Sequence, residues 1–346
     1  GLHGAPLRRG IDGCRGCGVC AFGCPSDAKM STHVSYLPRA QRAGATIYAN
    51  TRAARILVDE GRARGVVAEL LDPHTREPKA RVTVRSKLVV VAAGAIHTPA
   101  LLAANAIGNA SGQLGHNLRI HPAAAVAGFF DEDVRGWEGT LQSYYVDDWH
   151  ESEDFMIEVT SSVPSVGAGA FPGTGARLKQ LLGAYPNMAS AGLFVSDTSK
   201  GRVVRRPGRE PVITYRLNRR DTTQMVRGIV KTAEVLLAAG ARAVHTGIFG
   251  VDLVNGKQGL DEIAPAAVKP GRLRLSAFHP VGTARMGPDP AASVVGPYGE
   301  VHGVPGLFVA DASMLPGCPT VNPMITIMAF ATRTVDHVAR HGARYF

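Results

Sequence analysis

The segment that most constrains the fold is residues 306–324, which reads as a strand, a loop and the start of a helix. Leu307 opens an apolar run short enough for a buried strand, and Asp311 follows where that strand would end. Pro323 suits the first helical position and Asn322 the cap before it, because the apolar residues that follow recur at helical spacing. The free N–H groups and the dipole at such a helix start favour a group that becomes anionic.

A second buried strand is predicted in the aliphatic run that begins at Leu88 and ends in Ala93 and Gly94. A strand without polar residues is typical of a parallel sheet that is covered on both faces. Small residues at its carboxyl end let a ligand approach the backbone, where open α/β sheets bind nucleotides. Thr98 is expected to cap the following helix, with Pro99 at its first position. An ordinary buried strand–helix corner is the alternative interpretation.

Residues 125–275 show a different pattern, in which short segments of alternating apolar and polar residues predict strands and a hairpin. One helix is predicted from Asp221 to Leu237, because apolar residues recur along it at helical spacing and Gly240 follows its end. A length of 346 residues favours two domains. We therefore expect an antiparallel sheet with helices as a separate domain.

Four cysteines, Cys14, Cys17, Cys20 and Cys24, follow the C-x2-C-x2-C-x3-C-P spacing of bacterial ferredoxins. The glycines around them would let the backbone wrap tightly and direct N–H groups at sulfide. In two-cluster ferredoxins the fourth cysteine serves the second cluster, and this sequence has no second motif. A [4Fe-4S] cluster would therefore need all four thiols, and a [3Fe-4S] cluster would use three. A zinc site, or a compact loop with packed thiols, is the alternative.

Two loops carry polar groups between apolar segments. His279 lies in residues 279–287, where glycines and prolines predict a loop, and histidine is the usual acid or base at neutral pH. A structural histidine is the alternative reading. Residues 114–122 are also rich in polar groups, and we interpret them as a structural corner.

Charge and hydropathy exclude some function classes. The net charge is +10, but the arginines are scattered and no basic stripe is interleaved with aromatic residues, so nucleic-acid binding is not expected. An acidic protein partner is the alternative explanation of the charge. No run of apolar residues is long enough to span a membrane, and residues 1–10 lack a signal-peptide pattern. We expect a cytoplasmic protein.

Together these segments resemble the glucose-methanol-choline (GMC) oxidoreductase family, especially its bacterial and long-chain-alcohol-oxidase-like members. The resemblance is carried by residues 24–38, 89–99, 114–122, 279–287 and 306–323. It implies an α/β fold in which an α+β antiparallel substrate domain is inserted into a doubly wound, Rossmann-like FAD-binding sheet.

The resemblance also implies domain limits. Residues 1–124 would form the first part of the FAD-binding domain, with the cysteine-rich loop at residues 13–25. Residues 125–275 would bind substrate, and residues 276–346 would complete the FAD-binding domain and carry the catalytic residues.

By position in the family motifs, His279 resembles the active-site histidine beside flavin N5, and Asn322 resembles its partner. His279 would accept the proton of an alcohol while hydride leaves the carbinol carbon for N5, and Asn322 would orient the hydroxyl. The helix that starts at Pro323 would stabilise the anionic reduced ring. The resemblance implies FAD contacts at Ala53, Ala93, Gly94, Asp311, Ala312, Asn322 and Pro323.

One departure is large. The family begins with a strand and a G-x-G-x-x-G motif that holds the pyrophosphate, and this sequence contains neither. A sheet without its central strand exposes apolar edges. We therefore predict that a second polypeptide supplies this unit, or that the sequence is part of a longer chain.

The function expected from the resemblance is that of an FAD-dependent alcohol dehydrogenase or oxidase. If the cysteines hold a cluster, electrons would pass through it to an acceptor protein, and a dehydrogenase is expected. A flavin-bound lyase of the hydroxynitrile-lyase type and a non-catalytic subunit of a flavoprotein complex are the alternatives.

Overall fold

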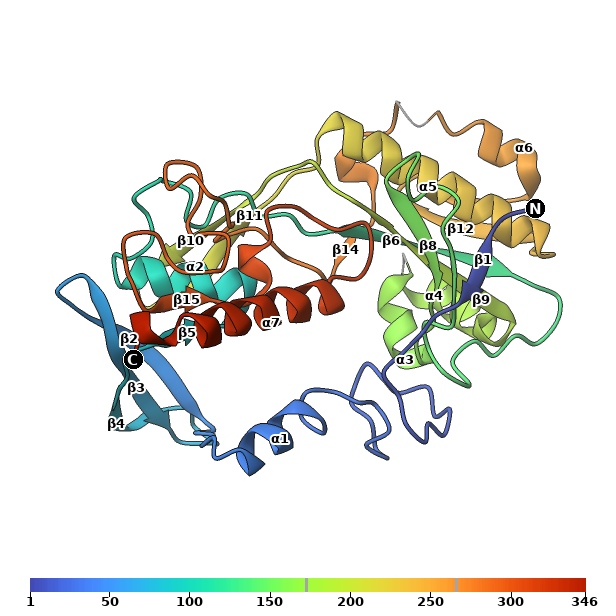
Figure 1. The fold of residues 1–346 in the computed structure, drawn as a ribbon. Helices are drawn as coiled ribbons and strands as arrows, with labels where there is room; N and C mark the ends of the chain where they lie inside the picture. The colour runs from blue at the N-terminus through green and yellow to red at the C-terminus, as the bar shows by residue number, and fades with distance from the viewer. Residues whose placement is uncertain (172–173, 265–266) are drawn as a thin grey trace. The chain divides into compact units, whose positions relative to one another are not determined.

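In the computed structural model, which describes residues 1–171, 174–264 and 267–346, the chain forms two compact units (Figure 1). Unit 1 comprises Gly1–Ile47, Pro122–Ser196 and Asn218–Ser276. Unit 2 comprises Tyr48–His121, Asp197–Leu217 and Ala277–Phe346. The domain limits implied by the family resemblance stay a prediction.

Unit 1 is built on an antiparallel sheet with the strand order β1-β7-β8-β9-β6-β12-β13. The strands are β1 (Gly4–Pro6), β6 (Pro122–Phe129), β7 (Tyr144–Val146), β8 (Phe155–Val159), β9 (Met188–Val195), β12 (Ala243–Ile248) and β13 (Val251–Val254). The helices are α1 (Tyr36–Arg42), α3 (Pro164–Gly167), α4 (Gly175–Gly183), α5 (Arg219–Ala238) and α6 (Gly256–Asp261). The sheet of alternating strands that the sequence predicts is therefore present.

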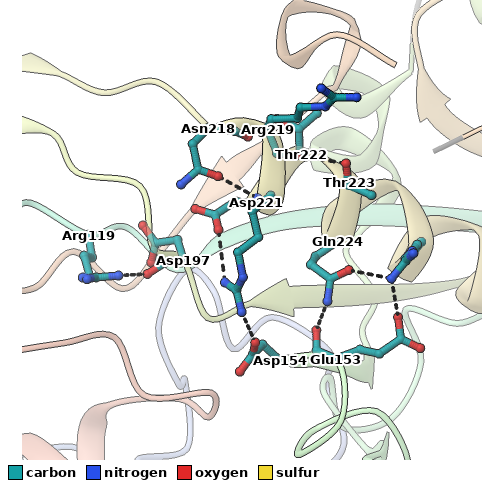
Figure 2. A network of polar contacts seen from close by, with 12 residues as sticks. Arg119, Glu153, Asp154, Asp197, Asn218, Arg219, Asp221, Thr222, Thr223 and Gln224 are labelled. Atoms are coloured by element: carbon teal, nitrogen blue, oxygen red, sulfur yellow. Dashed lines mark hydrogen bonds and ion pairs between the residues drawn. The ribbon is translucent and has the colours of Figure 1, made fainter. Parts of the chain in front are cut away.

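Helix α5 packs its apolar face against the sheet of unit 1, with Met225 and Ile229 buried. It begins where a side chain can cap it, since Asn218 Oδ1 accepts the backbone N–H of Asp221 at 2.8 Å (Figure 2). The helix predicted from the apolar spacing is confirmed, and the cap extends it by two residues at its start.

Unit 2 contains two short sheets, a hairpin and two helices. Its elements are β2 (Thr51–Asp59), β3 (Arg62–Leu71), β4 (Pro78–Arg85), β5 (Val89–Val91), α2 (Gly94–Ala104), β10 (Arg202–Arg206), β11 (Arg209–Thr214), β15 (Leu307–Val309) and α7 (Met324–Arg340). Strands β2, β3 and β4 form an antiparallel sheet, and β10 pairs with β11. Strand β14 (Ser276–Ala277) has its first residue in unit 1 and its second in unit 2.

Strands β5 and β15 pair in parallel, with Leu307 opposite Val89 and Val309 opposite Val91. These four side chains are buried in one core, but Val90 is 48% exposed. The expectation that this strand is covered on both faces is therefore wrong for this chain.

Both predicted helix starts differ from the structure. Helix α2 begins at Gly94, so Thr98 lies inside it and does not cap it, and Pro99 is an interior residue. Helix α7 begins at Met324 with Pro323 at the N-cap position, and no side chain caps it. Asn322 therefore lies one residue before the cap. Within the described ranges, no helix has both the length and the apolar character needed to cross a bilayer.

Candidate active site

Backbone hydrogen bonds hold the loop of residues 279–287 against two other segments of unit 2. Arg119 and Val281 exchange both N–H···O bonds, at 3.1 and 2.9 Å. Further along the loop, the N–H of Ala284 donates to the carbonyl of Ser313 at 2.8 Å. The loop with the predicted base therefore lies beside the segment that follows β15, as a shared site requires.

The Arg119–Val281 pairing brings two histidine side chains together. In an antiparallel pair, residues two positions onward on one strand and two positions back on the other are again opposite each other. These residues are His121 and His279, and their Nδ1 atoms lie 2.9 Å apart with ring centroids separated by 5.0 Å. His121 is fully buried and His279 is partly buried.

Burial controls the charge of both rings. Desolvation first, and then the neighbouring His279, lower the pKa of His121 to about 3. Desolvation also lowers the pKa of His279 below its usual value. Both rings are therefore neutral at neutral pH, and in their mutual hydrogen bond one Nδ1 donates and the other accepts.

Asp197 fixes the backbone that carries His121. Its carboxylate accepts the N–H groups of Ile120 at 3.1 Å and His121 at 3.3 Å, and the Tyr215 hydroxyl at 2.6 Å. The Arg119 guanidinium donates to the backbone carbonyl of Asp197 (Figure 2). His121 has φ = 50°, a left-handed conformation that is uncommon outside glycine, so these bonds stabilise an unusual backbone. Burial raises the pKa of Asp197, and the Tyr215 bond opposes that rise.

The loop before α7 also contacts Asp197. The Cys318 thiol is hydrogen-bonded to Asp197, and burial first and then the nearby carboxylate raise its pKa. Asn322 follows in the same loop and is partly buried. Asp197 thus connects the backbone of His121 to the loop that leads to the predicted partner residue. The catalytic pairing of His279 with Asn322 stays a prediction.

The side chain of Asp311 is bound by protein groups. One carboxylate oxygen accepts the N–H of Gly94 at 2.9 Å and the Thr98 hydroxyl at 2.5 Å, and the other accepts the N–H of Ser313 at 2.7 Å. Asp311 is 8% exposed. It therefore ties the end of β15 to the first turn of α2. The predicted FAD contacts of Asp311 and of Ala312, which opens a short 3-10 helix, stay predictions.

The carboxyl end of β5 has accessible backbone. Ala93 is exposed, and Gly94 has φ = 78° with no atom within 4 Å of the position that a Cβ would take. A flat ligand could therefore approach this backbone closely. Ala53 is exposed on β2, and Met324 is 62% exposed at the start of α7. The open backbone at Ala93 and Gly94 and the exposed Ala53 would leave room for the adenosine part of FAD.

The cysteine loop lies in unit 1. Cys14 and Cys17 are exposed, and Cys20 and Cys24 are partly buried. Within the described ranges, no group of three or more His, Cys, Asp or Glu side chains is arranged to hold a metal ion, so the structure does not support the predicted cluster. Hydrogen bonds from the Ser26 hydroxyl and then the Lys29 N–H lower the pKa of the Cys24 thiol.

The sequence predictions missed His121, Asp197 and Tyr215. The signal for His121 lies in the polar residues 114–122, for which the sequence alone favours a structural corner. Nothing local identified Asp197 or Tyr215, because both depend on contacts with segments remote in sequence.

Comparison with known proteins places these residues in context. GMC oxidoreductase family models match residues 1–123 and residues 197–331. An uncharacterized GMC-type oxidoreductase of Mycobacterium tuberculosis is 43% identical over 336 residues, which are 97% of this chain and 52% of that protein. A long-chain-alcohol oxidase of Arabidopsis thaliana is 27% identical, over 93% of this chain and 46% of that protein.

Among solved structures, the pyridoxine 4-oxidase from Mesorbium loti matches with a TM-score of 0.64 and 19% identity, over 91% of this chain and 61% of that one. This likeness confirms the predicted α/β fold class with a Rossmann-like sheet and an antiparallel second domain. The chain spans about half the length of the curated relatives it matches. These comparisons lend no support to the second polypeptide, the acceptor protein or the lyase alternative.

Proposed function

Because the chain belongs to the GMC oxidoreductase family, we propose that it supplies the base and part of the flavin site of an FAD-dependent enzyme acting on the CH–OH group of an alcohol. The observation that carries this proposal is the partly buried His279 ring, whose Nδ1 lies 2.9 Å from Nδ1 of His121. A neutral imidazole with one nitrogen engaged can accept a proton at the other.

Different residues of this chain have different roles in the proposed reaction. His279 accepts the hydroxyl proton of the alcohol at Nε2, and Asn322 orients the hydroxyl. FAD, when bound, supplies the hydride acceptor at flavin N5. The start of α7 directs its free N–H groups and positive dipole end at developing negative charge. Ala53, Ala93 and Gly94 leave backbone accessible to the nucleotide.

The pyrophosphate of FAD needs further residues. A G-x-G-x-x-G unit is absent from this sequence, so other residues of a longer chain or a second polypeptide would supply it. The exposed apolar side chains Val90, Met324 and Ile325, at 48%, 62% and 67% exposure, would be covered by that unit. This part of the proposal is supported by their exposure.

The cysteine loop carries a separate proposal, that it holds an iron–sulfur cluster and passes electrons to an acceptor protein. It is supported by the spacing alone. Iron and acid-labile sulfide in the purified protein would test it. Cys17→Ser should remove the iron, and Cys318→Ser, outside the loop, should retain it. Iron-free protein would contradict this proposal.

The main test is anaerobic reduction of the flavin by a primary alcohol, followed by the loss of its visible absorbance. We expect bleaching with the complete flavoprotein and a decrease of about 100-fold or more in its rate for His279→Ala. His74→Ala, at an exposed turn, is the matched control and should keep the wild-type rate. A lyase would leave the flavin oxidised, and unchanged bleaching in His279→Ala would contradict the assigned base.

A further inference from the structure

We propose that His121 is a positioning residue for His279: its Nδ1 accepts the Nδ1–H of His279 and so keeps the lone pair of His279 at Nε2. The inference deepens the proposed function and rests on it for the catalytic consequence. Its structural basis is independent of that function, because the 2.9 Å contact between the Nδ1 atoms lies entirely within unit 2.

The argument depends on which ring donates. A neutral imidazole carries one N–H, so a hydrogen bond between two Nδ1 atoms determines both tautomers. If His121 donated, His279 would carry its proton at Nε2 and could not take one from an alcohol. If His279 donates, its Nε2 has the lone pair that a base needs. After proton transfer, His279 has protons on both nitrogens and still donates to His121 through Nδ1.

His121 is suited to remain the acceptor. It is fully buried, and burial holds its pKa near 3, so it stays neutral while His279 gains charge. The proton taken from the alcohol therefore stays on His279. A ring that itself became charged would repel the imidazolium and weaken the base.

The contact is rigid because its backbone is held from both sides. The Arg119–Val281 pair sets the register, and Asp197 binds the backbone N–H of His121, whose φ is 50°. Asp197 itself is 1% exposed and is bound by the Tyr215 hydroxyl. Such a buried set of bonds keeps a ring in one orientation, as preorganised sites require.

The first experiment reads the tautomers directly. Two-bond ¹H–¹⁵N correlation spectra of the complete ¹⁵N-labelled flavoprotein at pH 7.5, assigned with His279→Ala and His121→Asn, distinguish protonated from unprotonated ring nitrogens. We expect His279 to carry its proton at Nδ1 and His121 at Nε2. A proton at Nε2 of His279 would overturn the proposal. The spectra need no substrate, so they decide the tautomer even if no alcohol reduces the flavin and the proposed function fails.

The second experiment measures alcohol-dependent flavin reduction in three variants at position 121. The amide of asparagine lies near the place of Nδ1 and can accept the His279 proton, whereas glutamine extends to the place of Nε2 and leucine offers no acceptor. We expect His121→Asn to stay within about 10-fold of the wild-type rate. His121→Gln and His121→Leu should lose about 100-fold or more in rate, with little change in the dissociation constant of the alcohol.

The matched control is His74→Asn, which should keep the wild-type rate. Circular dichroism and thermal unfolding show which variants fold, and His121→Gln replaces His121→Leu if leucine does not fold at this left-handed position. Wild-type rates in folded His121→Gln would overturn the inference, and so would equal losses in His121→Asn and His121→Gln. Rescue by asparagine supports it where the folded variants unfold at similar temperatures, because asparagine also tolerates the left-handed backbone of position 121 better than glutamine or leucine.

Discussion

Thr283 Oγ1 donates a hydrogen bond of 2.6 Å to the backbone carbonyl of Ala95, the acceptor that Pro99 leaves without its helical donor. Proline has no N–H, so α2 lacks one bond in its second turn. Thr283 lies in the loop that carries His279 and is fully buried. The loop of residues 279–287 therefore satisfies the carbonyl that the interior proline of α2 leaves free.

This relationship predicts a stability effect. Thr283→Val keeps the side-chain shape but leaves the Ala95 carbonyl buried and unbonded, so the free energy of unfolding should fall by roughly 1–3 kcal/mol. Thr283→Ser keeps the hydroxyl and should lose less. Urea unfolding of the two variants measures the difference, and equal values would show that the bond contributes nothing.

Asp311 should stabilise unit 2 strongly. Asp311→Ala removes the acceptor of Gly94 N–H, the Thr98 hydroxyl and Ser313 N–H together, so the free energy of unfolding should fall by at least about 3 kcal/mol. Asp311→Asn keeps one carbonyl oxygen and should lose less. The control is Asp336→Ala, on the exposed side of α7, which should change the free energy of unfolding by no more than about 0.5 kcal/mol. Chemical denaturation checks all three variants.

Gly282 should not tolerate a side chain. It has φ = 92°, and an added Cβ would lie 2.5 Å from the backbone oxygen of Asn117. Gly303 is a matched control, with φ = 79° and no atom within 4 Å of its Cβ position. Gly303→Ala should cost about 1–2 kcal/mol from its backbone conformation alone. Gly282→Ala should cost more and slow flavin reduction, because the clash displaces the loop of His279. Equal unfolding midpoints would contradict this.

The buried His121 predicts an acid-labile fold. Its pKa is about 3 in the folded state and near 6.5 when unfolded, so between these values the unfolded chain binds more protons. Its stabilising contribution is complete above pH 6.5 and is lost as the pH falls towards 3. The slope of the free energy of unfolding against pH should reach about 1.4 kcal/mol per pH unit. Unfolding curves from pH 8 to pH 4 measure it, and a folded His121→Asn variant should show a shallower slope.

The rate of flavin reduction should rise with pH and then level off. His279 acts as a base only when neutral, and burial lowers its pKa below the usual value of 6.5. The midpoint of the rise should therefore lie below pH 6.5. Stopped-flow reduction by a primary alcohol across this range checks it. A midpoint above pH 7 would show that His279 is more exposed or faces an unpaired carboxylate.

Much of the fold follows from local patterns. The apolar runs at β5 and β15 predict two short buried strands, and the helical spacing after Asp221 predicts α5 within two residues of its observed start. Exposure of Val90 on one side of β5 was not predicted, because an apolar run alone does not reveal which neighbours cover it. The start of α2 was also mistaken, because Thr98 and Pro99 fit a helix start locally.

What the sequence by itself determined is the set of chemical groups: an imidazole at His279, an amide at Asn322, small residues at Ala93 and Gly94, and the family to which their motifs belong. Only the tertiary structure decided which distant residues these groups contact. Asp311 binds Gly94 across 217 positions, and His121 meets His279 across 158. Local propensity carries no information about such register, because contacts between distant segments depend on the packing of the whole unit.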